Sequence, residues 1–269
     1  MNCKICNTQS VLLTKGTIFP EKMEISYYRC PNCGFIQTEE PHWLHKAYSD
    51  VIAKTDIGLV SRNIQYANLI EKVVLNLDLK LDTGLDYGGG YGMFTRLMRD
   101  KGFDFYWHDD YCENLFANGF EGDLKKKYDI ITAFEVLEHL PDPQTTLKGL
   151  IENSKCAFFS TCIQDYKDAS FLDWWYRAEY SGQHISFFTT KAMEYLAKQY
   201  KRNYYYLESQ SIHIFSDFEI DHKKLLDSVD HKPGFIEYQM TRFVKTLAPR
   251  KSLLTEDHEL LLKKYLNKK

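Results

Sequence analysis

The segment LDYGGGYG, residues 85–92, has the glycine spacing of a loop that holds a nucleotide-like ligand. A phosphate-binding P-loop would close with Gly-Lys-Ser/Thr, but residues 91–94 read YGMF. A dinucleotide loop, G-x-G-x-x-G, would need its third glycine where Met93 stands, which weakens an NAD site. Asp86 precedes the glycines, and its carboxylate would repel phosphates and attract a positively charged ligand. The loop therefore favours a cationic ligand over a polyphosphate.

A second acidic position follows one predicted strand later. Asp109 lies 21 residues after Gly88, where the next predicted strand ends. An acidic side chain at this place can hydrogen-bond the ribose hydroxyls of an adenosine ligand. Asp110 is a close competitor for the same role.

Two cysteine pairs near the start of the sequence, Cys3/Cys6 and Cys30/Cys33, have the spacing of a metal-binding knuckle. Four thiolates suit tetrahedral zinc at about 2.3 Å and leave no open position, which favours a structural ion over a catalytic one. A redox dithiol and a rubredoxin-like iron site are the alternatives, although a redox pair would call for a thioredoxin-like setting that the sequence lacks. The odd total of seven cysteines argues against a disulfide framework. We interpret the other three as buried small hydrophobic residues: Cys112, Cys156 and Cys162.

The elements that position these residues alternate between strands and helices. Residues 1–41 form a small zinc-ribbon-like module with one strand-like run, at 25–28. Residues 42–219 predict parallel βαβ units, an α/β fold with a Rossmann-like sheet and helices on both faces. Residues 220–269 predict a C-terminal helical extension whose last helix has Thr255 as N-cap. The expected strands are 81–87, 103–108, 128–134, 156–163 and an antiparallel edge pair, 204–208 and 211–215; the expected helices lie within 43–79 and at 91–101, 145–153 and 190–200.

Three stretches together resemble the class I S-adenosylmethionine-dependent methyltransferases. They are Asp86-x-Gly88-x-Gly90-x-Gly92, Asp109 one strand later, and YDIITAFEVLEHLPDP at residues 128–143. The resemblance covers residues 57–215 and implies that S-adenosylmethionine is the methyl donor. Asp86 would lie near its methionyl amine, the glycine loop against the donor, and Asp109 on the ribose.

The resemblance implies further donor contacts. Arg62 and Asn63 would lie on a helix folded over the donor, for which a plain surface helix is the alternative. Phe120 would stack near the adenine, for which a core position is the alternative. The remaining donor contacts implied are Tyr87, Phe134 and Glu135.

A zinc knuckle before such a core resembles sugar C-methyltransferases that modify nucleotide-linked deoxysugars, and related enzymes of polysaccharide and natural-product pathways. Those C-methyltransferases have a further large C-terminal domain, whereas about 50 residues follow the sheet here. The acceptor chemistry of those enzymes therefore does not carry over, and we expect O-methylation of a small sugar-derived acceptor, such as a nucleotide sugar or a polysaccharide precursor. The alternatives are N- or C-methylation of another small molecule, and a non-catalytic binding protein on the same fold.

Methyl transfer to a hydroxyl group needs in-line alignment and a base that removes the hydroxyl proton. Histidine suits this role at neutral pH. His184 lies in GQHISFF, a stretch that resembles a signature of this branch, and His139 follows the fourth expected strand. Tyr48 is a third candidate. For either histidine the alternative is a loop cap or a bond to a backbone carbonyl.

The stretch Trp174-Trp175-Tyr176 is either a hydrophobic lid on the core or an aromatic platform for a sugar or a base. On the second interpretation, Arg177 and Glu179 would bond hydroxyl or diphosphate groups of the acceptor.

Composition excludes several classes of protein. A net charge of -3 and a pI near 6.3 give no basic footprint for nucleic acid, and the run Lys125-Lys126-Lys127 is expected to be a solvated turn. The sequence shows neither a targeting segment nor a membrane-spanning run, so we expect a cytoplasmic protein. It leaves the oligomeric state open.

Overall fold

The computed structural model describes residues 1–19, 22–48, 57–165, 171–230 and 250–266. The contacts divide the chain into two compact units, described separately below. Unit 1 comprises Met1–Asp56, Leu124–Lys127 and Ile131–Glu219; unit 2 comprises Ile57–Asp123, Tyr128–Ile130 and Ile220–Lys269. The predicted boundaries at residues 41 and 219 stay a prediction.

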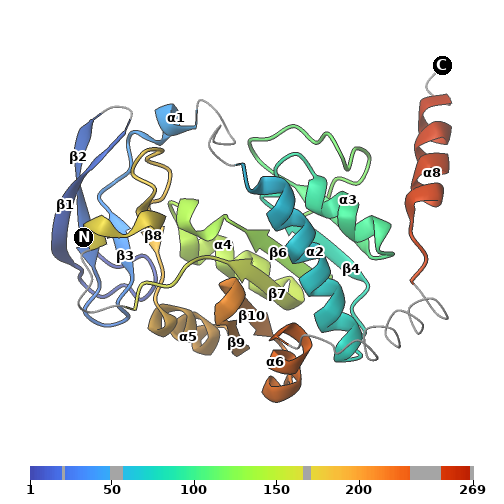
Figure 1. Cartoon of the computed structure of the whole chain (residues 1–269). Coiled ribbons are helices and arrows are strands. Elements are labelled where there is room, and N and C mark those ends of the chain that lie inside the picture. The colour runs from blue at the N-terminus through green and yellow to red at the C-terminus, as the bar shows by residue number, and fades with distance from the viewer. Residues whose placement is uncertain (20–21, 49–56, 166–170, 231–249, 267–269) are drawn as a thin grey trace. The chain divides into compact units, whose positions relative to one another are not determined.

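Unit 1 contains a four-stranded antiparallel sheet in the order β1-β2-β3-β8 (Figure 1). Its strands are β1 (Val11–Ile18), β2 (Met23–Arg29), β3 (Ile36–Thr38) and β8 (Ser186–Phe187). The sequence predicted only the run within β2. The sequence did not predict β1. Only Ile18 is buried in this strand, so its apolar residues do not alternate with polar ones as they would in a strand with one buried face.

A six-stranded sheet has the order β5-β4-β6-β7-β10-β9. The strands are β4 (Thr83–Tyr87), β5 (Asp104–His108), β6 (Tyr128–Phe134), β7 (Ser154–Ser160), β9 (Asn203–Leu207) and β10 (Ile212–Ser216). β4 and β5 pair in parallel, as the βαβ pattern predicts. β10 pairs antiparallel with β7 and with β9, which confirms the expected antiparallel pair at the edge.

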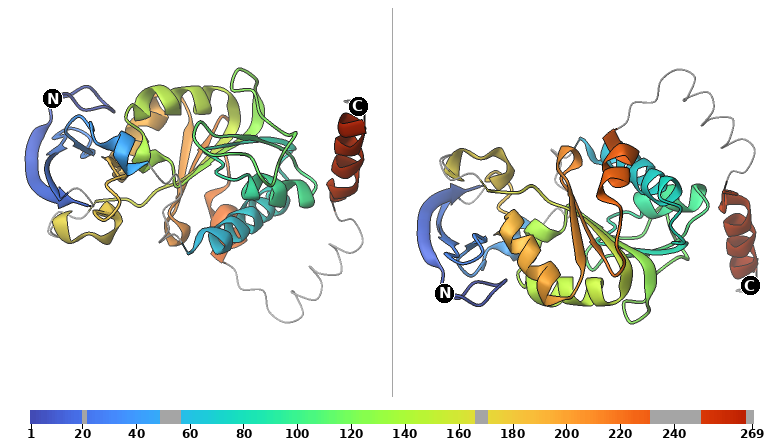
Figure 2. Two further views of the ribbon diagram at one scale, coloured as in Figure 1. Left: turned by 90° about the horizontal axis from the view of Figure 1, so that it is seen from above. Right: turned by 90° about the horizontal axis from the view of Figure 1, so that it is seen from below.

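The helices follow the expected pattern with shifted ends. They are α1 (Leu44–Ala47), α2 (Leu59–Asn76), α3 (Met93–Asp100), α4 (Pro143–Glu152), α5 (Thr190–Gln199), α6 (His222–Asp230) and α8 (Leu254–Leu266). Short 3-10 turns are η1 (Leu137–His139), η2 (Phe171–Asp173), η3 (Trp175–Arg177) and η4 (Glu208–Gln210). In unit 2, α2 and α3 pack side by side, as both views of Figure 2 show. Among the described residues, no helix is both long and apolar enough to cross a membrane.

The caps explain where two helices begin. α4 starts at Pro143, two residues before the expected start, because the side chain of Asp142 accepts a hydrogen bond from the Thr145 amide at 3.2 Å. The prediction that Thr255 caps α8 is wrong. The helix already begins at Leu254, whose amide donates to the hydroxyl of Ser252 at 3.2 Å.

A buried ion network joins α8 to α3 within unit 2. The Nε and Nη2 atoms of Arg99 donate to the two carboxylate oxygens of Asp257, each at 2.8 Å. Arg96 adds a third bond to Asp257 at 2.8 Å, and both Arg99 and Asp257 are buried. These bonds hold the Asp257 carboxylate ionised, and they lower its pKa against the opposing effect of burial.

Candidate functional site

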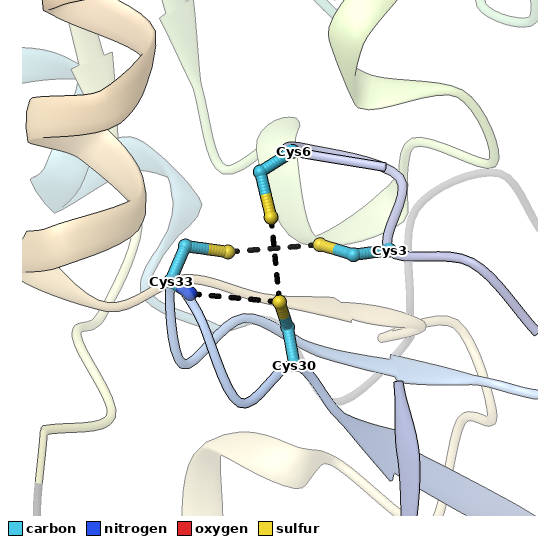
Figure 3. A group of neighbouring side chains, drawn as sticks. All are labelled: Cys3, Cys6, Cys30 and Cys33. Atoms are coloured by element: carbon cyan, nitrogen blue, oxygen red, sulfur yellow. Dashed lines mark hydrogen bonds between the residues drawn. The ribbon is translucent and has the colours of Figure 1, made fainter. Parts of the chain in front are cut away.

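Four cysteine sulfurs meet where the first residues of unit 1 approach the turn after β2 (Figure 3). The Sγ atoms of Cys3 and Cys33 are 3.6 Å apart, and those of Cys6 and Cys30 are 3.3 Å apart. Tetrahedral zinc with bonds of about 2.3 Å would separate its sulfurs by about 3.8 Å, so each pair need only move apart by about 0.2 to 0.5 Å to admit the ion. All four cysteines are free thiols, and together they fit a zinc ion without an open position.

The backbone around the sulfurs favours thiolates. The Ile5 amide donates to Cys3 Sγ at 3.4 Å, and the Cys33 amide donates to Cys30 Sγ at 3.5 Å. The hydrogen bond from Cys33 lowers the pKa of Cys3 to about 5, although burial opposes this shift. Glycine is favoured at position 34, where φ is 77° and an added Cβ would lie 3.1 Å from Thr189 Cγ2.

The three other cysteines differ from one another. Cys156 is buried in β7, as predicted. Cys112 and Cys162 are only half-buried, so the prediction is wrong for these two, which lie in loop segments outside the strands.

In unit 2, the glycine loop joins the end of β4 to α3. Gly88, Gly90 and Gly92 have φ values of 69°, 54° and 84°, the left-handed region that other residues avoid. The alternate spacing of these glycines in the sequence thus follows from a backbone that takes a positive φ at every second residue. Gly92 is also the N-cap residue of α3, directly before Met93.

Asp109 braces this loop. Its Oδ2 accepts a hydrogen bond from the Gly90 amide at 2.9 Å, and its Oδ1 accepts from the amides of Tyr111 and Cys112, both at 2.8 Å. The structure therefore brings Asp109 to the glycines, as expected for one binding loop. The competitor Asp110 is exposed and lies 3.2 Å from the imidazole of His108.

The other predicted donor residues of unit 2 lie as follows. Asp86 is buried, with 3% of its surface exposed, and Tyr87 stacks on His108 at 5.5 Å between ring centroids. Phe120 is buried, and the guanidinium of Arg99 covers one face of its ring at 3.7 Å. Arg62 and Asn63 lie on α2, where the Asn63 amide donates to its own helix at the Leu59 carbonyl. Contact with the donor stays a prediction for each of them.

In unit 1, two predicted donor residues end β6. Phe134 is the last residue of the strand, and Glu135 follows with a φ of 56°, which is unusual for a residue other than glycine. The Ser160 hydroxyl accepts from the Glu135 amide at 2.7 Å and donates to its carboxylate at 2.6 Å. This pair of bonds holds the Glu135 carboxylate in the left-handed turn.

The two predicted catalytic histidines also lie in unit 1, and they contact each other. The rings of His139 and His184 meet edge to face with centroids 4.8 Å apart. The amide of Ile185 donates to the Glu138 carbonyl at 2.8 Å, which places the GQHI stretch against η1. Tyr48, the third candidate, bonds His139 Nδ1 through its hydroxyl at 2.9 Å.

Burial decides the protonation of both imidazoles. It lowers the pKa of His184 to about 4, and together with the nearby His184 ring it lowers the pKa of His139 well below its usual value. Both side chains are therefore neutral at pH 7. His184 Nδ1 lies 2.6 Å from the Tyr176 carbonyl oxygen, to which it must donate, so the lone pair of His184 is on Nε2.

Glu138 is the residue that the sequence interpretation missed. It is fully buried beside these histidines, and burial, with the Glu135 carboxylate, raises its pKa to about 8. The signal was its place in EVLEHL, directly before His139.

The aromatic stretch divides between surface and core. Trp175 is 75% exposed, whereas Tyr176 is buried and its hydroxyl lies 3.2 Å from that of Thr161. Arg177 is buried, pairs with Glu179 and donates to the Leu172 carbonyl at 3.2 Å. This arrangement makes Arg177 a structural residue rather than an acceptor ligand. The lysine run 125–127 is an exposed turn, as expected.

The chain was compared with protein families and with solved structures. A family described as "Methyltransferase domain" matches residues 60–205, just over half of the chain. No curated protein matches the chain. The match confirms the predicted α/β methyltransferase class and the predicted class of enzyme.

Solved structures similar to the chain include three methyltransferases. The mitomycin 7-O-methyltransferase MmcR is 14% identical with a TM-score of 0.43, over 64% of this chain and 59% of that one. Magnesium protoporphyrin IX methyltransferase from Synechocystis PCC 6803, with bound SAH, is 14% identical with a TM-score of 0.40, over 64% and 90%. The plantazolicin methyltransferase BpumL is 15% identical with a TM-score of 0.45, over 76% and 85%. The chain thus spans less than two thirds of the first of these.

Proposed function

The chain belongs to the methyltransferase domain family, and we propose that it methylates a hydroxyl group of a small, sugar-derived acceptor with S-adenosylmethionine. The observation that carries the proposal is the loop after β4. There a buried carboxylate, Asp86, precedes three glycines with positive φ, and Asp109 holds the middle one. A sulfonium and an ammonium group suit such a carboxylate, whereas phosphates would be repelled.

Each residue of the proposed donor site has its own task. Asp86 attracts the ammonium group of the donor, and Asp109, besides bracing the loop, accepts from the ribose hydroxyls. Without side chains, the glycines let the backbone of the loop lie against the ligand. Gly92 also has no room for a side chain, because an added Cβ would lie 2.7 Å from Asn114 Oδ1. The proposed contacts further include Tyr87, Phe120, Phe134 and Glu135.

The chemistry is a displacement at carbon. The acceptor oxygen forms a bond to the methyl carbon while the carbon–sulfur bond breaks, and the electron pair of that bond stays on the sulfur. The protein aligns the reactants and receives the acceptor's proton. We assign the proton to Nε2 of His184, because the bond from Nδ1 to the Tyr176 carbonyl leaves the lone pair there. His139 and Tyr48 are the second candidates.

Zinc completes the proposal at the N-terminal module. Cys3, Cys6, Cys30 and Cys33 would hold a structural ion that joins the turn before β1 to the turn after β2 and takes no part in catalysis. We propose a cytoplasmic location, where cysteines stay reduced and can bind zinc.

Calorimetry with S-adenosylhomocysteine tests the donor site. We expect the full chain to bind it and Asp86→Ala to lose most of the affinity, while Asp110→Ala, the exposed neighbour, binds as the wild type does. If the wild-type chain does not bind S-adenosylhomocysteine, or if Asp86→Ala binds it with wild-type affinity, the proposed donor site is wrong.

Turnover tests the acceptor side. A screen with labelled donor over nucleotide sugars, sugar phosphates and small amines should find a hydroxyl acceptor; an amine product instead would identify an N-methyltransferase. His184→Ala should retain donor affinity and lose turnover, with the exposed His45→Ala as its control. Full turnover in His184→Ala would remove this residue from the mechanism.

A further inference from the structure

A second cluster of metal-ligating side chains lies in unit 1, apart from the four cysteines. One ligand atom each of Glu138, His139 and His184 lie within 4.8 Å of one another. Ligands at about 2.1 Å from one ion are roughly 3 to 4 Å apart, so closing this set requires movements of about 1 Å. Side-chain rotations are enough for that distance.

The Glu138 carboxyl group is the buried member of this cluster. It is 0% exposed, and neither of its oxygens makes a hydrogen bond of normal geometry to any residue in the part of the chain that the structure describes. The nearby hydroxyls of Thr161 and Tyr176 lie 3.2 Å apart and can bond each other. The two hydroxyls favour the ionised form of Glu138, but burial outweighs them and keeps the group protonated at pH 7. A cation beside it would offset the cost of ionisation, so the carboxylate could form.

Both imidazoles are oriented as ligands usually are. His184 has Nδ1 fixed by the Tyr176 carbonyl at 2.6 Å, and His139 has Nδ1 bonded to the Tyr48 hydroxyl at 2.9 Å. A ring nitrogen anchored by a carbonyl or hydroxyl group leaves the other nitrogen aimed at the metal, as around many metal-bound histidines. One nitrogen of each ring lies within 4.8 Å of the other ring and of a Glu138 oxygen, and a metal at the His139 ring would compete with its hydrogen bond to the Gln183 backbone.

We propose that Glu138, His139 and His184 bind one divalent first-row transition metal ion. Two imidazoles and one carboxylate leave coordination positions open, unlike the closed set of four cysteines, and this is the composition of catalytic sites. The Glu135 carboxylate, held by Ser160, adds negative charge close to the cluster.

The role of the ion rests on the proposed function, whereas its binding does not. An acceptor hydroxyl at an open position would lose its proton to solvent water more easily because the ion stabilises the remaining alkoxide. His184 is then a ligand instead of the proton acceptor. The two roles of His184 exclude each other, and the metal content decides between them.

The test is a titration of the full chain with Mn²⁺, followed by the electron paramagnetic resonance signal of the free ion. Mn²⁺ prefers oxygen and nitrogen ligands, so it leaves zinc on the cysteines in place. Elemental analysis beforehand gives the zinc content and reveals any ion already in the cluster. We expect one tightly bound ion per chain besides the zinc on the cysteines.

Variants assign the ion to the cluster. Glu138→Gln, which keeps the shape of the side chain, and His184→Asn should lose this ion and keep the zinc, whereas the exposed His45→Asn should keep both. Absence of a second ion in the wild-type chain, or an unchanged second ion in Glu138→Gln, would overturn the metal site. Retained binding of S-adenosylhomocysteine in that case would leave the methyltransferase proposal standing; its loss would overturn that proposal separately.

Discussion

Gly89→Ala adds one methyl group beside the carboxylate that we assign to the donor. The new Cβ would lie 2.7 Å from Asp86 Oδ2 and 2.8 Å from Trp107 Cδ1. Ordinary contacts begin at 3.4 Å, so the carboxylate would have to retreat by about 0.7 Å. The indole yields less easily, because its Nε1 donates to the Gly90 carbonyl at 2.8 Å. We therefore expect Asp86 to move.

The magnitude follows from this displacement. Crowding of this kind costs about 1 to 3 kcal/mol of stability. An ion pair stretched from about 4 to about 4.7 Å weakens by about 0.6 kcal/mol at an effective dielectric constant of about 20. If its aligned hydrogen bond is lost as well, about 1.5 kcal/mol more disappears. The donor affinity should thus fall by a factor between about three and about thirty.

Calorimetry with S-adenosylhomocysteine measures the affinity, and thermal unfolding measures the stability. Gly149→Ala is the matched control: Gly149 lies in α4, nothing is within 4 Å of the added methyl group, and a gain of about 0.5 to 1 kcal/mol is expected. A folded Gly89→Ala protein with wild-type affinity would refute the assignment of Asp86 to the donor.

Two further predictions concern unit 1. Cys33→Ser should lose zinc in elemental analysis and lower the unfolding temperature, because structural zinc contributes to folding directly, whereas Cys112→Ser should change neither; full zinc content in Cys33→Ser would contradict the cage. Burial lowers the pKa of His213 to about 4, below its unfolded value near 6.5, so the fold prefers the neutral ring. Its contribution is present above pH 6.5 and is lost as the pH falls toward 4, by about 3 kcal/mol in total. Urea unfolding at pH 7.5 and pH 4.5 should show a smaller pH dependence for His213→Gln than for the wild-type chain, and equal dependence would refute this.

Local chemistry in the sequence predicted much of the fold and part of the site. The glycine spacing after β4 is visible in the sequence because each positive φ needs its own glycine, and β6 has the predicted bounds because most of its side chains are buried. The spacing of the paired cysteines likewise predicts that they form one cluster.

The features that the sequence did not predict depend on contacts between residues far apart in the chain. The strand β8 is two residues long and completes the sheet of β1, β2 and β3 from far along the chain, so no local pattern marks it. Arg177 has the charge of a ligand in the sequence, but bonds to Thr17 and Glu179 make it structural. Glu138 reads as one polar residue among several, since only the tertiary structure shows that its carboxylate is buried.

The hydrogen bonds between Arg99 and Asp257 can form only late in the synthesis of the chain. The two residues are 158 positions apart, and a ribosome adds roughly 5 to 20 residues each second. About 8 to 30 seconds therefore pass between the synthesis of Arg99 and that of its partner. During this interval the partners of the guanidinium that are already synthesised include Asp104 and the Phe105 carbonyl. The stretch Ile57–Asp123 of unit 2, which carries the glycine loop, is made well before α8, so the ion network around Arg99 is completed only when Asp257 arrives.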